Sequence, residues 1–351
     1  MSTFNRYHRS DIVINTDKLV TSTWSNNDNM LGSGQFHTSS LQSDQTDTNS
    51  QGNFFIDVYH EPTSSVSSSV QFSVSYGHRK GSGSKDFTND TGSFGYSPSK
   101  CIYNQYRQLV FGDETQDFQF SDHTADSIYV INIERARYKQ NLKPGSLNLW
   151  LSKTSGTGLA TIKLTDDSVS VTGSAKMTNL GRQYNIVSGA DGVMKGTTIS
   201  QVASSASYGL FYPDAGVIIL NAEAFAQGGT TGMTQIGQPT VSSNTNGNNH
   251  TELFNVIKAG AHFIIDSEER VSSQYYFTRV KNFELNYTTN PSFIDNTGTL
   301  NFDTMIDMPR VYITTVGLYN DNGDLLAVAK LSQPLAKDFT KEALVRVKLD
   351  Y

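Results

Sequence analysis

Hydrophobic and polar residues alternate most regularly near the end of the chain. Two apolar, β-branched-rich runs, 311–319 and 325–331, flank the polar segment 320–324. Asn and Gly in that segment tolerate the positive φ of a tight turn, so the pattern predicts a β-hairpin. Apolar and polar positions then alternate over 343–350, which predicts a final strand with one wetter face. A strand that ends at Tyr351 is expected to be part of the fold or of an interface, because untethered termini fray.

Similar runs predict strands in the rest of the chain. The segments 54–59, 70–76, 127–133 and 147–151 are rich in β-branched, aromatic or other apolar residues. Between residues 144 and 227, glycine turn signals recur at intervals of roughly 8 to 12 residues, which is typical of an all-β sandwich or barrel. The chain is therefore predicted to be mainly β, with antiparallel, sandwich-like sheets, a few short helices and long polar loops.

Two segments show helical spacing instead. One begins after Pro98, with Ser99 as the expected N-cap, and places Tyr103 and Tyr106 on one face. The other is expected to begin at Thr251.

Three polar segments, 21–53, 77–95 and 228–249, interrupt the strand pattern. The first carries isolated apolar residues such as Trp24 and Phe36. It predicts either an assembly arm that orders on a neighbouring subunit or a mobile surface loop. The predicted parts are an N-terminal arm with the first strands (1–60), a mixed β domain with one helix (61–143), a middle β domain (144–228) and a C-terminal antiparallel β domain (250–351).

Several segments carry a resemblance to a known class of proteins. They are VGLYNDNGDLLAVAKLSQPL (316–335), VRVKLDY (345–351), YGHRKGSGS (76–84), SPSKCIYNQYRQLVF (97–111), INIERARY (131–138) and LKPGSLNLWL (142–151). Together they resemble virion structural proteins of T-even-like contractile-tailed phages of the marine, cyanobacterial type. The resemblance covers less than half of the chain. It implies a tail or baseplate component, present in several copies beside other tail proteins, and it assigns no functional residue.

Composition narrows the remaining classes of function. A net charge of −6 and a pI of about 5.6 give no basic footprint for nucleic acid. The single Cys101 excludes a disulfide framework within the chain and a cysteine-based zinc site. No stretch of about 18 apolar residues is present, so no membrane span is expected, and the protein is expected to be made in the host cytoplasm.

Catalytic motifs are weak or missing. The glycine-rich segment 77–86 lacks the Gly-Lys-Ser/Thr ending of a phosphate-binding loop, and the seven His residues show no ligand spacing. The adjacent carboxylates Asp113-Glu114 and Glu268-Glu269 are of the residue type used in glycoside hydrolysis, but solvated loop charges explain them better. No catalytic, cofactor-binding or metal-binding residue is predicted, and no enzyme activity is expected.

The sequence favours an architectural protein of the virion, in the baseplate of a contractile tail, that joins neighbouring subunits. A receptor-recognition or fibre-attachment protein is the alternative, since a surface rich in Tyr, Ser, Asn and Gly suits it equally, and a tail-associated glycan hydrolase is the third. Aromatic residues and the last strand supply the candidate interface. The residues predicted for it are Trp24, Phe36, Tyr103, Tyr106, Val345, Val347, Leu349 and Tyr351.

Overall fold

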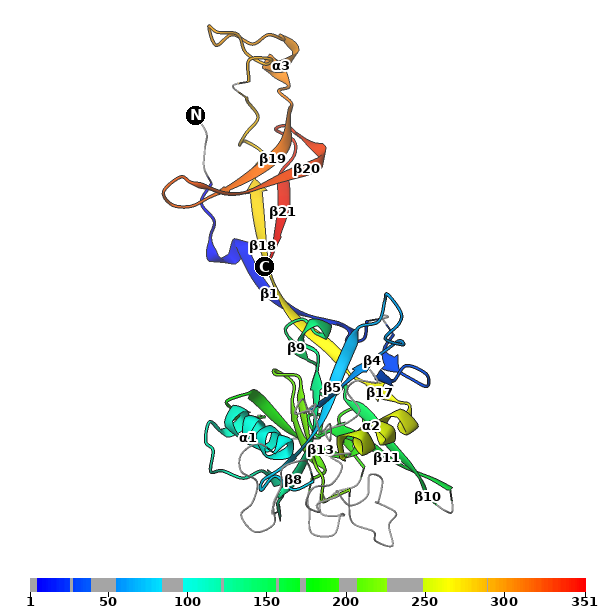
Figure 1. Ribbon diagram of the computed structural model, residues 1–351. Coiled ribbons are helices and arrows are strands. Elements are labelled where there is room, and N and C mark those ends of the chain that lie inside the picture. Colours follow the sequence, from blue (N-terminus) through cyan, green and yellow to red (C-terminus); the bar gives the residue numbers. More distant parts are fainter. Residues whose placement is uncertain are drawn as a thin grey trace. The chain divides into compact units, whose positions relative to one another are not determined.

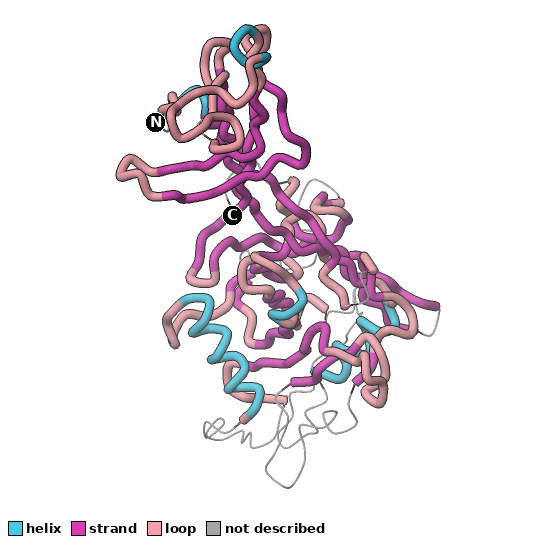
Figure 2. Tube along the Cα trace, turned by 90° about the horizontal axis from the view of Figure 1, so that it is seen from above, coloured by secondary structure: helices cyan, strands magenta, loops and turns pink. Residues whose placement is uncertain are grey.

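The computed structural model confirms a mainly β chain (Figures 1 and 2). It describes residues 5–25, 28–38, 55–83, 97–120, 123–155, 158–170, 175–195, 207–225, 249–288 and 290–351. The chain divides into two compact units. The central unit comprises Leu19–Glu269, and the terminal unit comprises Met1–Lys18 together with Arg270–Tyr351.

A thirteen-stranded sheet forms the central unit, and its pairings are antiparallel. It curls into a half-barrel. Its strands in spatial order are β2 (Met30–Leu31), β17 (Phe263–Ile264), β10 (Asn148–Ser155), β11 (Gly158–Asp166), β13 (Gly181–Ala190), β15 (Gly209–Tyr212), β16 (Val217–Asn221), β8 (Ser127–Ile133), β5 (Val70–His78), β4 (Phe55–Tyr59) and β3 (His37–Thr38), with β12 (Lys176–Thr178) and β14 (Val193–Met194) paired to β13. Short pairs add β6 (Gln119–Phe120) with β7 (His123–Thr124), and β9 (Asn141–Leu142) with Ser267 and Glu268.

The middle of this sheet is buried on both faces. In β8, Ile128 and Val130 point into one core, while Tyr129 and Ile131 point into the other. The neighbouring β16 alternates in the same way. Both strands therefore read in the sequence as continuous apolar runs, as expected for strands covered on each side. Helices α1 (Pro98–Phe111) and α2 (Asn249–Gly260) supply side chains to the two different cores and flank the sheet (Figure 1).

Helix α1 approaches its strand very closely at Gly77 of β5. A Cβ atom at that position would lie 2.9 Å from the backbone nitrogen of Tyr103. The helix begins after Ser97, not after Ser99 as predicted, because the Ser99 hydroxyl donates instead to the carbonyl of Ser82 at 3.0 Å. It ends at Gly112, whose left-handed backbone (φ 69°) lets its N–H donate to the carbonyl of Gln108.

The segment predicted as an arm or mobile loop belongs to the fold wherever it is described. Trp24, Leu31 and Phe36 are all buried in the main core. The indole N–H of Trp24 donates to the carbonyl of Phe263 at 3.0 Å, and the two rings meet edge to face. The remaining predicted arm residues, 26–27 and 39–53, lie outside the described part, as do most of the polar loops predicted at 77–95 and 228–249.

The domain boundaries also differ from the prediction. Strands from the predicted domains 61–143 and 144–228 pair directly in one sheet, for example β8 with β16. Residues 1–18 and 270–351, which were predicted to lie in different domains, form one unit. Both boundaries depend on strand pairing between segments that are far apart in the sequence, and hydrophobic patterns read along the chain do not show such pairing.

The terminal unit is small, and strands make up most of its regular structure. It contains the part of β1 (Ile12–Ser22) up to Lys18 and the part of β18 (Asp266–Val280) from Arg270 onward. Strand β18 pairs with β21 (Ala343–Asp350) on one side, and β1 lies on its other side. The predicted hairpin is present as β19 (Val311–Tyr319) and β20 (Leu325–Lys337). Its inner face packs on β21, so that Leu318, Val345 and Val347 form the buried core. The short helix α3 (Thr304–Asp307) lies in the connection before β19.

Two polar features tie the terminal unit together. Tyr351 exchanges two backbone hydrogen bonds of 3.0 Å with Ser272, so the last strand is paired to its final residue, as the alternation predicted. The Lys337 side chain is fully buried. Its ammonium group donates to the carbonyls of Asn282 (2.9 Å) and Asp338 (3.0 Å) and to Oδ1 of Asn286 (2.7 Å). These bonds hold the end of β20 against the segment after β18.

Gly77→Ala is expected to lower the free energy of unfolding of the central unit by about 1–3 kcal/mol, because the added methyl group meets helix backbone that cannot rotate away. Urea unfolding followed by tryptophan fluorescence measures it, since both tryptophans lie in the central unit. Gly32→Ala is the matched control, where the nearest atom to a new Cβ is the flexible end of Met30 at 3.4 Å. Equal stabilities of the two variants would contradict the close approach.

Lys337→Met is expected to destabilise the terminal unit by about 2–4 kcal/mol, because three oxygens, among them the buried Oδ1 of Asn286, lose their donor. Hydrogen exchange of the β20 amides, read by mass spectrometry, reports on this unit alone. Lys330→Met removes an exposed ammonium from the same strand and should change the stability by less than about 0.5 kcal/mol. Similar exchange in both variants would show that the Lys337 contacts contribute nothing.

Candidate interaction surface

The residues predicted for an interface lie mostly inside the chain. Six of them are buried in its own cores: Trp24, Phe36, Tyr103, Tyr106, Val345 and Val347. Leu349 is half-buried against the terminal core, and Tyr351 is 68% exposed. Burial explains the first six as core residues. For Leu349 and Tyr351 an interface role stays a prediction.

Exposed apolar side chains gather on the terminal unit. Among the described residues, 26 large apolar side chains are exposed, and 17 of them belong to this unit, which has only 100 of the 351 residues. Its hydrophobic cluster has only three fully buried members, whereas the main cluster of the central unit has 32. A small unit with a small core and many exposed apolar side chains is typical of a surface that is covered in an assembly.

One exposed group lies on the outer face of the hairpin. Tyr319 is opposite Leu325, and Val328 is opposite Gly317. The register shift at this point leaves Leu326 without an opposite residue, and its side chain is 68% exposed. We call Tyr319, Leu325, Leu326 and Val328 the hairpin patch.

Gly317 shapes the hairpin patch. A Cβ atom there would lie 2.9 Å from Cε2 of Tyr319 and 3.4 Å from Cδ1 of Leu325. The tyrosine ring therefore covers a strand glycine, an arrangement that protects the backbone of a weak strand position. The ring is fixed in place and still presents 45% of its surface to solvent.

A second exposed group lies between β18 and β19. We call residues 281–310 the apolar arm. Its exposed apolar side chains are Phe283, Leu285, Tyr287, Phe302, Ile306 and Met308. Only Phe293 is a buried hydrophobic residue in its described part, where Tyr287 contacts it edge to face. The arm has little regular structure beyond α3 and a single bridge between Ile294 and Leu300.

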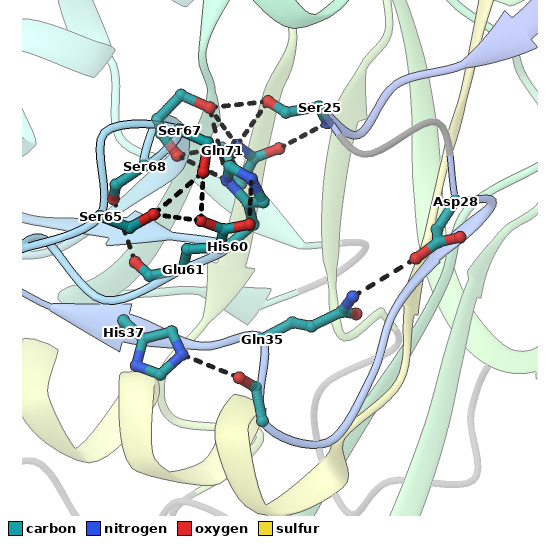
Figure 3. Close-up of polar contacts among 12 residues, drawn as sticks. Ser25, Asp28, Gln35, His37, His60, Glu61, Ser65, Ser67, Ser68 and Gln71 are labelled. Atoms are coloured by element: carbon teal, nitrogen blue, oxygen red, sulfur yellow. Dashed lines mark hydrogen bonds and ion pairs between the residues drawn. The ribbon is translucent and has the colours of Figure 1, made fainter.

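One cluster of polar side chains lies in the central unit (Figure 3). Gln71 is fully buried, and its side-chain oxygen accepts the N–H of Ser25 at 3.1 Å. Its amide nitrogen lies 2.7 Å from Oγ of Ser25 and 3.2 Å from Nδ1 of His60. The hydroxyls of Ser25 and Ser69 are 2.8 Å apart. This cluster fastens the chain just after Trp24 to the start of β5.

A turn beside this cluster is organised by Glu61. One carboxylate oxygen accepts the hydroxyls of Ser65 and Ser67, each at 2.5 Å. These two hydroxyl groups hold the pKa of Glu61 below its usual value. They lie on either side of Val66, whose side chain is fully exposed.

His60 lies between a serine and a carboxylate, the residue types that accompany a catalytic base. Its Nδ1 lies 3.4 Å from Oγ of Ser69, and its Nε2 lies 3.8 Å from Oε1 of Glu61. Both distances exceed the 2.6–3.2 Å reach of an active nucleophile and base. The cluster is therefore best explained as a structural network. Among the described residues, no group of three His, Cys, Asp or Glu side chains has the arrangement of a metal site, and no helix has the length and apolar character needed to cross a membrane.

The sequence missed the hairpin patch and the apolar arm. The hairpin was predicted without its covered face, because period-2 alternation shows that a strand has two faces but not which face is covered. A usable signal was present in the adjacent Leu325 and Leu326, which break the alternation and cannot both point inward in a regular strand.

Glu61→Ala is expected to loosen the turn at Ser65–Ser68 at every pH, because both hydroxyl groups lose their acceptor. In the natural protein, the lowered pKa means that the carboxylate orders the turn above its unfolded pKa. This order is lost as the pH falls through the lowered pKa of the folded state. The amide resonances of Ser65 and Ser68, followed by NMR against pH, test both points. Glu114→Ala removes an exposed glutamate elsewhere and should leave these resonances unchanged; identical spectra for the two variants would refute the role of Glu61.

Comparisons with known proteins return no relative. No protein-family model, no curated protein sequence and no solved structure matches the chain.

Proposed function

We propose that this chain is an architectural protein of a contractile phage tail, located in the baseplate, and that its terminal unit binds neighbouring subunits. The sequence resemblance of segments such as 316–335 and 345–351 supports the virion assignment. The concentration of exposed apolar side chains on the terminal unit supports the binding role.

That concentration is the observation that carries the proposal. Seven aromatic side chains of the terminal unit are each about half exposed. At about 200 Å² for each side chain, they present roughly 800 Å² to solvent, before the aliphatic residues are added. A standard protein interface buries about 800 Å² on each partner. The terminal unit therefore has enough apolar surface for a stable contact.

Charge favours the same unit over the central one. The terminal unit has twelve Lys and Arg residues against eleven Asp and Glu residues, a formal charge of +1. The remaining 15 basic and 22 acidic residues give the central unit −7. Because a nearly neutral surface meets little long-range repulsion, the terminal unit suits close packing in an assembly.

The test separates incorporation into particles from folding. Leu326→Ser combined with Val328→Ser removes apolar area from the hairpin patch and should cost about 2–3 kcal/mol of binding free energy. Particles that carry the variant should contain clearly less of this chain, measured by quantitative mass spectrometry of separated tail and capsid fractions, whereas the purified variant should melt like the natural protein.

Val169→Ser combined with Val193→Ser is the matched control, since both side chains are exposed on the central unit. It should be incorporated normally. In natural particles the chain should be enriched with baseplates at a small multiple of six copies. Its absence from particles, or its enrichment with capsids, would contradict the proposed function, and equal incorporation of both double variants would contradict the binding role of the hairpin patch.

A further inference from the structure

The sheet of the terminal unit has one face that no described residue covers. In β21, Val345 and Val347 point into the core that packs against the hairpin. Successive residues of a strand point to opposite faces. Leu344, Arg346 and Lys348 therefore point to the other face of the sheet, and all three are exposed. We call this side of β18 and β21, within the terminal unit, the open face.

Two arginines lie next to each other on the open face. Arg346 is opposite Phe277 of β18, and Arg279 is opposite Leu344, so the two arginines are diagonal neighbours across the strand pair. Such neighbours lie about 7–8 Å apart. Both are exposed, and neither forms an ion pair with a described residue. We call Arg279 and Arg346 the arginine pair.

The arginine pair suits a partner that supplies two carboxylates. The neighbouring Lys348 is already balanced by Asp350, at 3.0 Å, and by the nearby Asp17. The Arg346 guanidinium lies 5.4 Å from the ring centre of Tyr275, a contact that limits its motion. A guanidinium can bind a carboxylate through two parallel hydrogen bonds. Two adjacent carboxylates would therefore satisfy both arginines and remove the repulsion between them.

The central unit has one exposed pair of adjacent carboxylates. Three pairs of adjacent acidic residues occur in the chain. Asp166, Asp167 and Glu268 are buried, so the two pairs that contain them cannot meet another molecule. Asp113 and Glu114, which follow helix α1, are both exposed and form no ion pair within the described part of the chain. We call Asp113 and Glu114 the acidic turn.

The acidic turn is fixed in place and charged. The buried Arg107 donates to the carbonyl of Glu114. Oδ1 of Asp113 accepts the N–H and the hydroxyl of Thr115, both at 2.8 Å. These bonds hold the pKa of Asp113 below its usual value, so that its carboxylate is charged at neutral pH. A turn that is already ordered loses little conformational entropy when it binds.

Charge favours a second copy of this chain as the partner. The terminal unit has a formal charge of +1 and the central unit one of −7, so the terminal unit of one copy is attracted to the central unit of another. Every copy has both the arginine pair and the acidic turn. The contact between copies is therefore head-to-tail and can repeat, which gives a ring if the rotation closes and a filament if it does not.

We infer that the arginine pair of one copy binds the acidic turn of a second copy, with one carboxylate on each guanidinium. This inference rests on the proposed assembly function and names one contact of it. The two charge pairs orient the copies, and the half-buried Phe277 beside both arginines adds apolar area to the contact.

Charge reversal on each surface tests the contact. Arg279→Glu with Arg346→Glu brings like charges to the acidic turn, and Asp113→Lys with Glu114→Lys brings like charges to the arginine pair. Either double variant alone should raise the dissociation constant of self-association about tenfold or more at low salt, measured by sedimentation velocity on the full chain. An equimolar mixture of the two double variants restores opposite charges at every contact and should form mixed oligomers in native mass spectrometry.

Lys281→Glu with Lys330→Glu is the matched control. It makes the same change in net charge at exposed residues of the terminal unit that lie outside the open face, and it should weaken self-association far less. Melting curves identify any variant that fails to fold. In that case the neutral variants Arg279→Gln with Arg346→Gln, and Asp113→Asn with Glu114→Gln, replace the reversals and should weaken self-association in the same direction.

Three results would overturn the inference: a natural chain that stays monomeric, reversals without mutual rescue, or a control that weakens association as much as the reversals do. If particles nevertheless contain the chain, the proposed function stands and only this contact fails. If rescue occurs but particles lack the chain, the contact stands and the proposed function fails.

Discussion

The central unit depends on two strands that are apolar on both faces. Because β8 and β16 have no wet side, each face of the sheet needs its own cover, and one layer of helix is found on each. The α1 side is packed so closely that only glycine fits at residue 77 of β5. The α2 side shares its core with Trp24 and Phe36, so residues near the beginning of the chain complete the cover. Removal of either layer would leave a continuous row of Ile, Val, Leu and Tyr in water.

Local features of the fold could be predicted from the sequence, and non-local ones could not. The hairpin of β19 and β20 and the alternating strand β21 depend on turn residues and on a two-residue period, both of which lie within a short window. The pairing of β8 with β16 joins segments about 85 residues apart, and no short window contains it. Trp24 and Phe36 were misjudged for the same reason. Polar neighbours in sequence suggested a loop, whereas their neighbours in space are Phe72 and Phe263.

The sequence suggested that the chain has an interaction surface, but not which residues form it. An aromatic-rich chain without catalytic motifs suggested an interface, but composition does not distinguish an aromatic core from an aromatic exterior. The structure makes that distinction. Of the aromatic residues chosen from the sequence, all but Tyr351 are buried, whereas the aromatic residues of the hairpin patch and the apolar arm, except Phe293, are exposed. The polar residues His60 and Gln71 belong to the hydrogen-bonded cluster inside the central unit. The buried Lys337 holds the end of β20 in place within the terminal unit.

The division of the chain also fixes an order of events during synthesis. The central unit is an insertion between residues 18 and 270, and every segment of it leaves the ribosome before the hairpin and β21 exist. Since domains fold as units and earlier segments fold first, the large sheet can close while residues 5–18 still wait for their strand partners. The surface of the terminal unit that carries the exposed apolar side chains is therefore formed last.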